Sequence, residues 1–366
     1  MHRVRPVRQG MPEKGPLHER EHRLFAAIQE LAAFRTANNA GRHFVTDQGG
    51  DVEVSPSIPS GMKDRCMMRP KSFPIQGPYD LALSLKAASR FSPDRTEPSE
   101  VFHAAVRVGS TPVLLEVNQP EKGKPLLDIS SPTSQHISGL VDIAYWMLFG
   151  ELELKPFYAV TGKHEILSSI VEELHGLKPM RPASLFEMAI TAITEQQISL
   201  AAAYRIRGRL LTAFGDRIDG LWAFPSPDRL ARTTVEEMKD CGLSRRKAEY
   251  IKGLAVNIVN GSLDLDDLKD LPDEDARSYI INIRGFGIWS ADYILVRGLG
   301  RVDCLPADDL GIQTIVGKYL GDGSRMSPEG VGKALEPFTP YRGLTAFYLL
   351  AHSRLHREDS LTEKMK

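Results

Sequence analysis

Residues 271–311 read LPDEDARSYIINIRGFGIWSADYILVRGLGRVDCLPADDLG, and this stretch is the part of the chain that indicates the fold most clearly. Between Asp273 and Ile283 apolar residues recur at helical spacing, and Leu271-Pro272 is a natural start for a helix. A second apolar stripe begins at Ile288 and ends near Leu299, where glycines close it. Because only a tight turn separates the two stripes, the stretch predicts two helices joined by a hairpin at residues 283–288.

The turn of this hairpin carries Gly285 and Gly287. Glycine accepts backbone angles that other residues resist, and it has no side chain to block an incoming phosphate. The first amides of the second helix face outward, with the positive end of the helix dipole behind them. Such a hairpin can hold a DNA backbone without reading its sequence. Two glycines can equally close an ordinary helical hairpin, and the turn alone does not separate these interpretations.

The order of residues after the hairpin resembles the helix-hairpin-helix (HhH-GPD) DNA glycosylase superfamily. Its signature is a Leu-Pro step, a helix, a hydrophobic-x-Gly-x-Gly turn and a later catalytic aspartate. Here Asp309 lies 309 − 289 = 20 positions beyond Trp289, as the resemblance requires. Residues 305–311 are similar to the branch of bacterial 3-methyladenine DNA glycosylase II, which makes Asp309 the catalytic candidate. One of the two acids can also cap a helix that begins near Leu310, and we expect Asp308 to cap while Asp309 projects into the pocket.

The resemblance implies a monofunctional enzyme of base excision repair. It would hydrolyse the N-glycosidic bond of a flipped-out alkylated purine of the 3-methyladenine type and leave an abasic site. Branches that also cut the backbone carry a Schiff-base lysine at the position of Trp289, which cannot do this chemistry. Two alternatives stay open, an 8-oxoguanine-type glycosylase and a non-catalytic helix-hairpin-helix module that binds damaged DNA.

The same resemblance assigns roles to further residues. A flipped base must leave the stack before its glycosidic bond can be reached, and a side chain then fills the gap. Residues 184–199 look like the family's helix before the intercalating loop, in which Ser184 and Glu187 have the form of a capping box. Aromatic side chains at helical spacing are more often core than pocket, and two glutamines at a helix end are often plain surface residues. The resemblance nevertheless implies a substrate pocket formed by Trp289, Tyr293 and Tyr341. The DNA contacts that it implies are Gln197, Gly285, Phe286 and Gly287.

No cofactor is expected to be required. The resemblance implies a Na⁺ or K⁺ ion among the carbonyls of the hairpin, and no other metal. Some branches of the superfamily close with four clustered cysteines around an iron–sulfur cluster. This chain has Cys66, Cys241 and Cys304 at wide spacing, so we predict no such cluster.

The expected fold class is α+β, with a small antiparallel sheet followed by a mostly helical domain. Residues 1–70 are rich in charge, Gly, Pro and Ser and are predicted to be a disordered extension, in which Met62 is an alternative start. Residues 71–178 are predicted to form the α+β domain and residues 179–366 the helical domain. Alternating apolar residues predict strands at 79–85, 101–107 and 113–117, with a turn at Gly109-Ser110, and helices are expected at 133–149 and 163–175.

Composition limits the partners. The chain has 366 residues, 42% of them hydrophobic, and a net charge of −1, whereas a DNA-binding protein usually carries net positive charge. Total charge does not forbid a local basic face, and the family binds DNA largely through hairpin amides and a few basic residues. We see neither a signal peptide core nor a membrane-spanning run. The expected partner is damaged double-stranded DNA, bound by a monomer, weakly and with salt sensitivity where the DNA is undamaged. The expected location is the cytoplasm in a prokaryote and the nucleus in a eukaryote.

Overall fold

The computed structural model describes residues 69–89, 100–133 and 135–363, with side chains up to residue 356. The predicted extension 1–70, including Met62, therefore lies almost wholly outside the described residues. The described chain falls into two units, of which the larger contains the described residues up to 196 and from 205 onward, and the smaller contains the described residues 197–204. Both sheets and the helices belong to the larger unit, except that α7 (Leu200–Phe214) begins in the smaller one.

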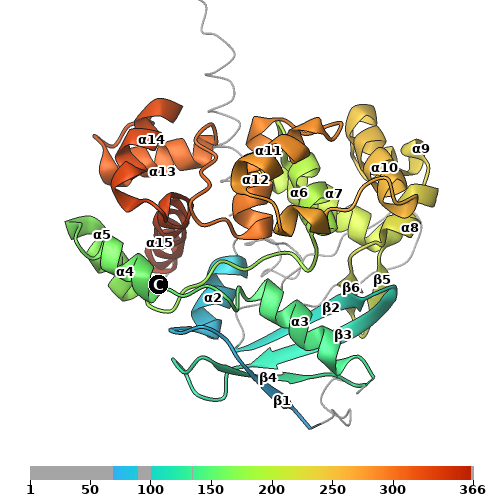
Figure 1. Cartoon of the computed structure of the whole chain (residues 1–366), viewed down its shortest axis with the longest axis horizontal. Helices are drawn as coiled ribbons and strands as arrows, with labels where there is room; N and C mark the ends of the chain where they lie inside the picture. Colours follow the sequence, from blue (N-terminus) through green and yellow to red (C-terminus); the bar gives the residue numbers. More distant parts are fainter. Residues whose placement is uncertain (1–68, 90–99, 134, 364–366) are drawn as a thin grey trace, which may run out of the picture. The chain divides into compact units, whose positions relative to one another are not determined.

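The first sheet is antiparallel, with the strand order β1-β4-β3-β2 (Figure 1). β2 pairs with β3 from Val101 opposite Asn118 to Val108 opposite Thr111, across the predicted turn at Gly109-Ser110. The hairpin prediction is thus confirmed. The sequence did not reveal β1 and β4, because strands of four and five residues are too short for alternation to stand out. The strands of this sheet are β1 (Lys71–Pro74), β2 (Val101–Val108), β3 (Thr111–Asn118) and β4 (Leu126–Ser130).

Helices make up most of the chain beyond this sheet, in agreement with the α+β class. A short hairpin of β5 (Asp216–Ile218) and β6 (Leu221–Ala223) lies against β2 and β3, where Arg107 Nε donates to the Phe224 carbonyl at 2.7 Å. The helices before this hairpin, apart from α7, are α2 (Leu81–Ser89), α3 (Ile137–Met147), α4 (Lys155–Thr161), α5 (Glu165–Glu173) and α6 (Leu185–Glu195). Those after it are α8 (Pro227–Arg232), α9 (Val235–Asp240), α10 (Arg245–Val259), the 3₁₀-helix η2 (Asp266–Lys269), α11 (Asp273–Asn282), α12 (Ile288–Ile294), the π-helix η3 (Leu295–Leu299), α13 (Leu310–Leu320), α14 (Pro328–Leu335), the 3₁₀-helix η4 (Glu336–Phe338) and α15 (Arg342–Glu363).

The strand predicted at residues 79–85 is wrong, because this segment is helix α2. The alternation of Leu81, Leu83 and Leu85 hides a helical pattern, in which Leu81, Ser84 and Leu85 are buried at positions i, i+3 and i+4. Asp80 begins the helix, since its Oδ1 accepts a hydrogen bond from the Leu83 amide at 2.9 Å. Asp80, a residue type that often caps helices, was the signal available in the sequence, and the leucine alternation obscured it.

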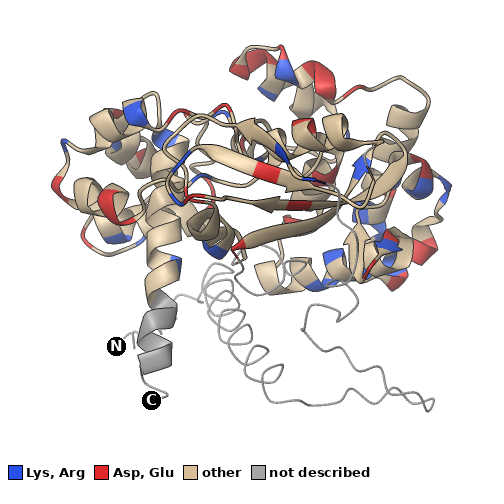
Figure 2. Ribbon diagram, turned by 90° about the horizontal axis from the view of Figure 1, so that it is seen from below, with Lys and Arg blue, Asp and Glu red and all other residues tan. Residues whose placement is uncertain are grey.

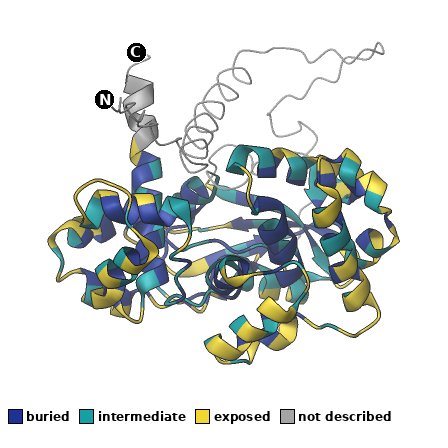
Figure 3. Cartoon of the chain, turned by 90° about the horizontal axis from the view of Figure 1, so that it is seen from above, coloured by how far each residue is buried: buried dark blue, intermediate teal, exposed yellow. Residues whose placement is uncertain are grey.

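Three apolar clusters of buried residues hold the described elements together. Figure 3 shows the buried residues in dark blue. The first joins the sheet to α2 and α3 through residues such as Phe102, Leu127 and Leu140. The second surrounds α6, which buries nine of its eleven residues against α10, α11 and α12. The third joins α4 and α5 to α13, α14 and α15. The predicted domain limit at residue 178 therefore does not divide the core, because residues 149–177 pack with residues 312–355.

Candidate active site

The predicted hairpin is formed by α11 and α12, with a turn at residues 283–287. Gly285 has φ +106°, and a Cβ there would lie 2.6 Å from Cγ of Tyr250. Glycine is therefore required at this position for two reasons, conformation and close packing. Gly287 has an ordinary φ of −121°, and a Cβ there would meet no described atom within 4 Å. Its lack of a side chain leaves the start of α12 open.

The two apolar residues that flank Gly287 differ in exposure. Phe286 is only 8% exposed and its side chain packs in the cluster around α6, and its role as a DNA contact stays a prediction. Ile288, which the sequence suggested as part of the inward stripe, is 61% exposed. An exposed isoleucine beside an open helix start is a feature that sequence periodicity could not reveal.

The hairpin helices are tied together by a charged pair. Arg277 on α11 donates from Nε to Asp292 Oδ1 on α12 at 2.7 Å. Burial raises the pKa of Asp292, partly offset by the hydrogen bond and charge of Arg277. The pair is one reason why the turn between the helices has a defined shape.

The end of α6 is anchored to the same hairpin. Gln196 donates from Nε2 to the Gly285 carbonyl at 2.8 Å and to Ser290 Oγ at 3.0 Å. Lys247 on α10 donates from Nζ to the carbonyls of Thr194 and Gln196, and burial lowers its pKa. Gln196 is thus a structural link and not a plain surface residue. The adjacent Gln197 is exposed and has φ +55°, a left-handed conformation that is rare outside glycine.

Asp309 is itself the cap of α13. Its Oδ1 accepts from the amides of Gly311 at 2.8 Å and Ile312 at 3.0 Å, and Asp308 is exposed. The prediction that Asp308 caps this helix is therefore wrong. The other oxygen, Oδ2, lies 3.2 Å from Nε1 of Trp289, which donates to it. The structure brings together the two residues that the sequence spacing had paired.

Trp289 stacks on Tyr293, with ring centroids 4.9 Å apart and an interplanar angle of 16°. The Tyr293 hydroxyl donates to Glu195 Oε2 at 2.7 Å, and Arg207 donates to Oε1 of the same carboxylate at 2.7 Å. Glu195 and Arg207 are both buried, so the hydroxyl end of the stack rests on a buried ion pair. Glu195 and Arg207 were not among the predicted site residues, because nothing in a sequence marks which acid at a helix end will be buried.

Tyr341 contacts a different part of the molecule. Its ring packs edge-on against Phe157, 5.7 Å between centroids, in the cluster that joins α4 and α5 to α13–α15. Its place in the substrate pocket stays a prediction.

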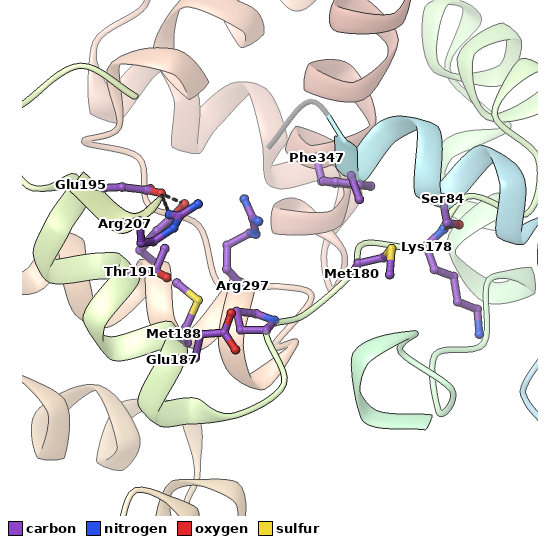
Figure 4. Close-up of a pocket in the computed structure, with 13 residues that line it drawn as sticks. Ser84, Lys178, Met180, Glu187, Met188, Thr191, Glu195, Arg207, Arg297 and Phe347 are labelled. Atoms are coloured by element: carbon purple, nitrogen blue, oxygen red, sulfur yellow. Dashed lines mark hydrogen bonds and ion pairs between the residues drawn. The ribbon is translucent and has the colours of Figure 1, made fainter. Parts of the chain in front are cut away.

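Tyr293 also lines a small pocket, and Figure 4 shows Glu195, Arg207 and Arg297 among the other residues around it. Tyr293, the Glu195–Arg207 pair and Arg297 line it, and the guanidinium of Arg297 lies 5.7 Å from the Tyr293 ring centroid. Its volume of about 70 Å³ is far below the roughly 300–1,000 Å³ of ligand pockets. The pocket therefore does not hold a base in this conformation. Arg297 comes four residues after Tyr293, a helical spacing from which its approach could have been foreseen.

The hairpin carbonyls that would hold an alkali ion already accept one hydrogen bond each. The Ile283 carbonyl accepts from the Phe286 amide at 3.2 Å, and the Gly285 carbonyl accepts from Gln196. Each oxygen keeps a second lone pair, and hard oxygen donors are the ligands that such cations prefer. The donor chemistry fits, and the ion would hold the turn without taking part in bond breaking.

The elements around the hairpin define a helix-hairpin-helix protein with an antiparallel sheet before its helices. Residues 190–340 match the family described as HhH-GPD superfamily base excision DNA repair protein. The Alkylbase DNA glycosidase-like protein mag2 of Schizosaccharomyces pombe is 30% identical over 183 residues, which cover 50% of this chain and 84% of that protein. The chain belongs to the HhH-GPD superfamily.

Other relatives extend the comparison. The DNA-3-methyladenine glycosylase of Bacillus subtilis is 30% identical over 201 residues, 54% of this chain and 66% of the relative. The chain spans 64% of the length of a second B. subtilis relative. The 3-methyladenine DNA-glycosylase structure from Archaeoglobus fulgidus superposes with a TM-score of 0.68 and 25% identity, covering 78% of this chain and 98% of that one. The described helices include none with the length and apolarity that a membrane span requires.

Proposed function

We propose that the protein is a monofunctional DNA glycosylase of base excision repair. It hydrolyses the N-glycosidic bond of a flipped-out alkylated purine of the 3-methyladenine type and leaves an abasic site. The observation that carries the proposal is the Asp309 carboxylate, which the start of α13 and the Trp289 indole hold beside an aromatic stack. The names of the B. subtilis and A. fulgidus relatives support the substrate class.

The aromatic stack suits an electron-poor base. An alkylated purine carries positive charge, which weakens its bond to the sugar and attracts it to aromatic faces. Trp289 and Tyr293 lie nearly parallel and offer such a face beside Asp309. The site therefore needs to supply modest assistance for a base that is already a good leaving group. Neutral lesions would need a general acid.

Asp309 supplies that assistance. As the bond to the base breaks, positive charge develops on the sugar, and a carboxylate held next to it stabilises this charge. The same group can orient or deprotonate the attacking water. Hydrogen bonds to both of its oxygens hold the carboxylate in place, so little reorganisation is needed during the reaction.

Trp289 argues for hydrolysis without strand cleavage. A lyase step needs an amine that forms a Schiff base with the sugar. An indole nitrogen has no lone pair available for this, and here its N–H is engaged with Asp309. The product is therefore an intact abasic site.

The DNA contacts are expected at the open turn and the exposed loop. The amides at the start of α12 would receive a phosphate beside Gly287. Gln197, exposed and in a left-handed conformation, would enter the gap that the flipped nucleotide leaves. The protein would act as a monomer on damaged duplex DNA, in the cytoplasm of a prokaryote or the nucleus of a eukaryote.

The test is base release from methylated duplex DNA by wild type, Asp309→Asn and the control Asp308→Asn, analysed on denaturing gels with and without hot alkali. Asparagine caps a helix about as well as aspartate, so Asp309→Asn removes the negative charge and keeps α13 in place. We expect at least a 100-fold loss of turnover in Asp309→Asn, within the range that electrostatic stabilisation supplies. Asp308→Asn should remain active.

Breaks that appear only after alkali, with retained binding of damaged DNA by Asp309→Asn, would support the proposal. Breaks without alkali would contradict the argument from Trp289. Release at the wild-type rate by Asp309→Asn would remove Asp309 from the mechanism. Binding without release of any base would identify a non-catalytic module instead.

A further inference from the structure

A second cluster of chemically active side chains lies where α5 meets α15. Glu173 is the last residue of α5, and His352 and His356 are one helical turn apart on α15. The Nε2 atom of His352 lies 3.3 Å from one oxygen of Glu173, and the Nε2 atom of His356 lies 2.8 Å from the other. The ligand atoms of all three groups lie within 4.8 Å of one another. The proposed glycosylase chemistry uses none of them.

We infer that Glu173, His352 and His356 form a binding site for a divalent transition-metal ion of the Zn²⁺ type. Two histidines at i and i+4 on one helix, with a carboxylate from another element, make a ligand set that zinc uses widely. Zinc bonds of about 2.0–2.2 Å place the ligand atoms closer together than the present limit of 4.8 Å, so the side chains must move together when the ion binds. Water would complete the coordination, because all three residues are reachable from solvent, with Glu173 and His356 each 47% exposed and His352 19%.

A neighbouring hydroxyl already orients one ligand. The Tyr319 hydroxyl on α13 lies 2.6 Å from Nδ1 of His352, which leaves Nε2 to face Glu173. Such an outer hydrogen bond is usual for metal-bound histidine. A hydroxyl both donates and accepts, so it can serve either tautomer. When a metal takes Nε2, the ring proton exchanges through solvent to Nδ1 and is donated to Tyr319.

The site would connect three helices. The ion would link α5 to α15 directly and α13 through Tyr319. Tyr319 lies ten residues after Asp309, about 15 Å along the helix that Asp309 caps. The metal would therefore stabilise the cluster of α4, α5 and α13–α15 from its edge, without touching the reacting groups.

The experiment is calorimetric titration of the metal-free full-length protein with Zn²⁺, together with Co²⁺ absorption and thermal unfolding. The variants are Glu173→Gln and His356→Ala, with the adjacent exposed Glu172→Gln as matched control and circular dichroism to verify folding. Tyr319→Phe tests the outer hydrogen bond. We expect one ion per chain, a higher Tm with Zn²⁺, and a Co²⁺ spectrum with nitrogen ligands. Both ligand variants should lose this binding, Tyr319→Phe should weaken it by about 10-fold, and Glu172→Gln should keep it.

The chain has ten histidines, so binding elsewhere must be separated from this site. Equal Zn²⁺ affinity and stoichiometry in wild type and in both ligand variants would mean binding elsewhere and would overturn the inference. Absence of Zn²⁺ binding by the wild type would overturn it too. Neither result would affect the glycosylase proposal, because the readouts do not include base release.

Discussion

The two carboxylate oxygens of Asp309 have different hydrogen-bond partners. Oδ1 caps α13 through the amides of Gly311 and Ile312, while Oδ2 faces the Trp289 indole. A capping role and a catalytic role are therefore not alternatives at this residue, because a single carboxylate has enough acceptor positions for both. Substitutions here change stability and chemistry by separate routes.

We therefore predict that Asp309→Ala and Asp309→Asn differ in stability. Alanine removes the cap and should cost about 1 kcal/mol of unfolding free energy, whereas asparagine should stay within about 0.5 kcal/mol of wild type. Urea unfolding measures the difference. Equal destabilisation by both would mean that the charge, and not the hydrogen bonds of Oδ1, stabilises α13.

A second prediction concerns Lys178 and the dependence of stability on pH. This lysine is buried, and Nζ donates to the carbonyls of Gln76 at 2.8 Å and Phe149 at 3.1 Å. Burial lowers its pKa to about 7, from 10.5 for ordinary lysine. Between these values the unfolded chain binds more protons than the folded one. Stability from this group therefore increases with pH across that range, by up to about 1.4 kcal/mol per pH unit.

The measurement compares wild type with Lys178→Met in urea unfolding at pH 7, 8 and 9. Methionine has no ionisable group, so the unfolding free energy of wild type should increase relative to the variant as pH rises. Other groups titrate in both proteins and cancel in the difference. Parallel pH profiles would show that the amine remains charged in the folded protein.

Among the elements, the hairpin of α11 and α12 carries the sequence motif that is most directly linked to the proposed DNA binding. Its two glycines look alike in the sequence, but glycine occupies the two positions for different physical reasons. Gly285 is needed by the fold, because of its positive φ and the close approach of Tyr250. Gly287 is not needed by the fold, since its φ is ordinary and the space around its Cα is open.

We predict opposite outcomes for the two alanine substitutions. Gly285→Ala should destabilise the protein by at least 1–2 kcal/mol, because left-handed backbone alone costs about that for an L-residue and Tyr250 must also move. Gly287→Ala should change stability by less than about 0.5 kcal/mol but weaken DNA binding, since its methyl group would stand where a phosphate approaches. Thermal unfolding and fluorescence anisotropy with duplex DNA measure the two effects. Full DNA affinity in a folded Gly287→Ala protein would place the phosphate elsewhere.

For the molecule as a whole, charge is the informative quantity. The chain has 46 Lys and Arg against 47 Asp and Glu, and Figure 2 shows both signs interspersed along the helices. The basic run 245–247 is partly engaged within the protein, since Arg245 pairs with Glu236 and Lys247 turns inward to α6. Phosphate binding must then depend more on backbone amides than on a basic surface.

A shallow salt dependence is the expected consequence of this arrangement. If two to four phosphates are neutralised, the logarithm of the affinity for undamaged duplex should fall with the logarithm of the salt concentration with a slope of about −2 to −4. Anisotropy titrations at salt concentrations between about 50 and 200 mM measure this slope, because DNA affinity changes strongly with salt in that range. A slope steeper than about −6 would indicate a basic surface that the described residues do not suggest.

Four features could be predicted from the sequence, namely the α+β class, the hairpin helices, the β2–β3 pairing and the link between Trp289 and Asp309. These features rest on short-range rules, namely helical spacing, turn residues and a motif of constant spacing. Asp309 and Trp289 could be paired because the motif counts residues along the chain.

The tertiary structure alone decided which of two neighbouring aspartates caps α13, that Phe286 is buried while Ile288 is exposed, and that α2 is not a strand. It also enclosed Glu195 with Arg207 under Tyr293 and brought Glu173 to His352 and His356 across about 180 residues of chain. Such outcomes depend on packing between segments far apart in sequence. The local pattern is the same whichever face a neighbouring helix covers, so burial and long-range pairing are fixed only in the folded arrangement.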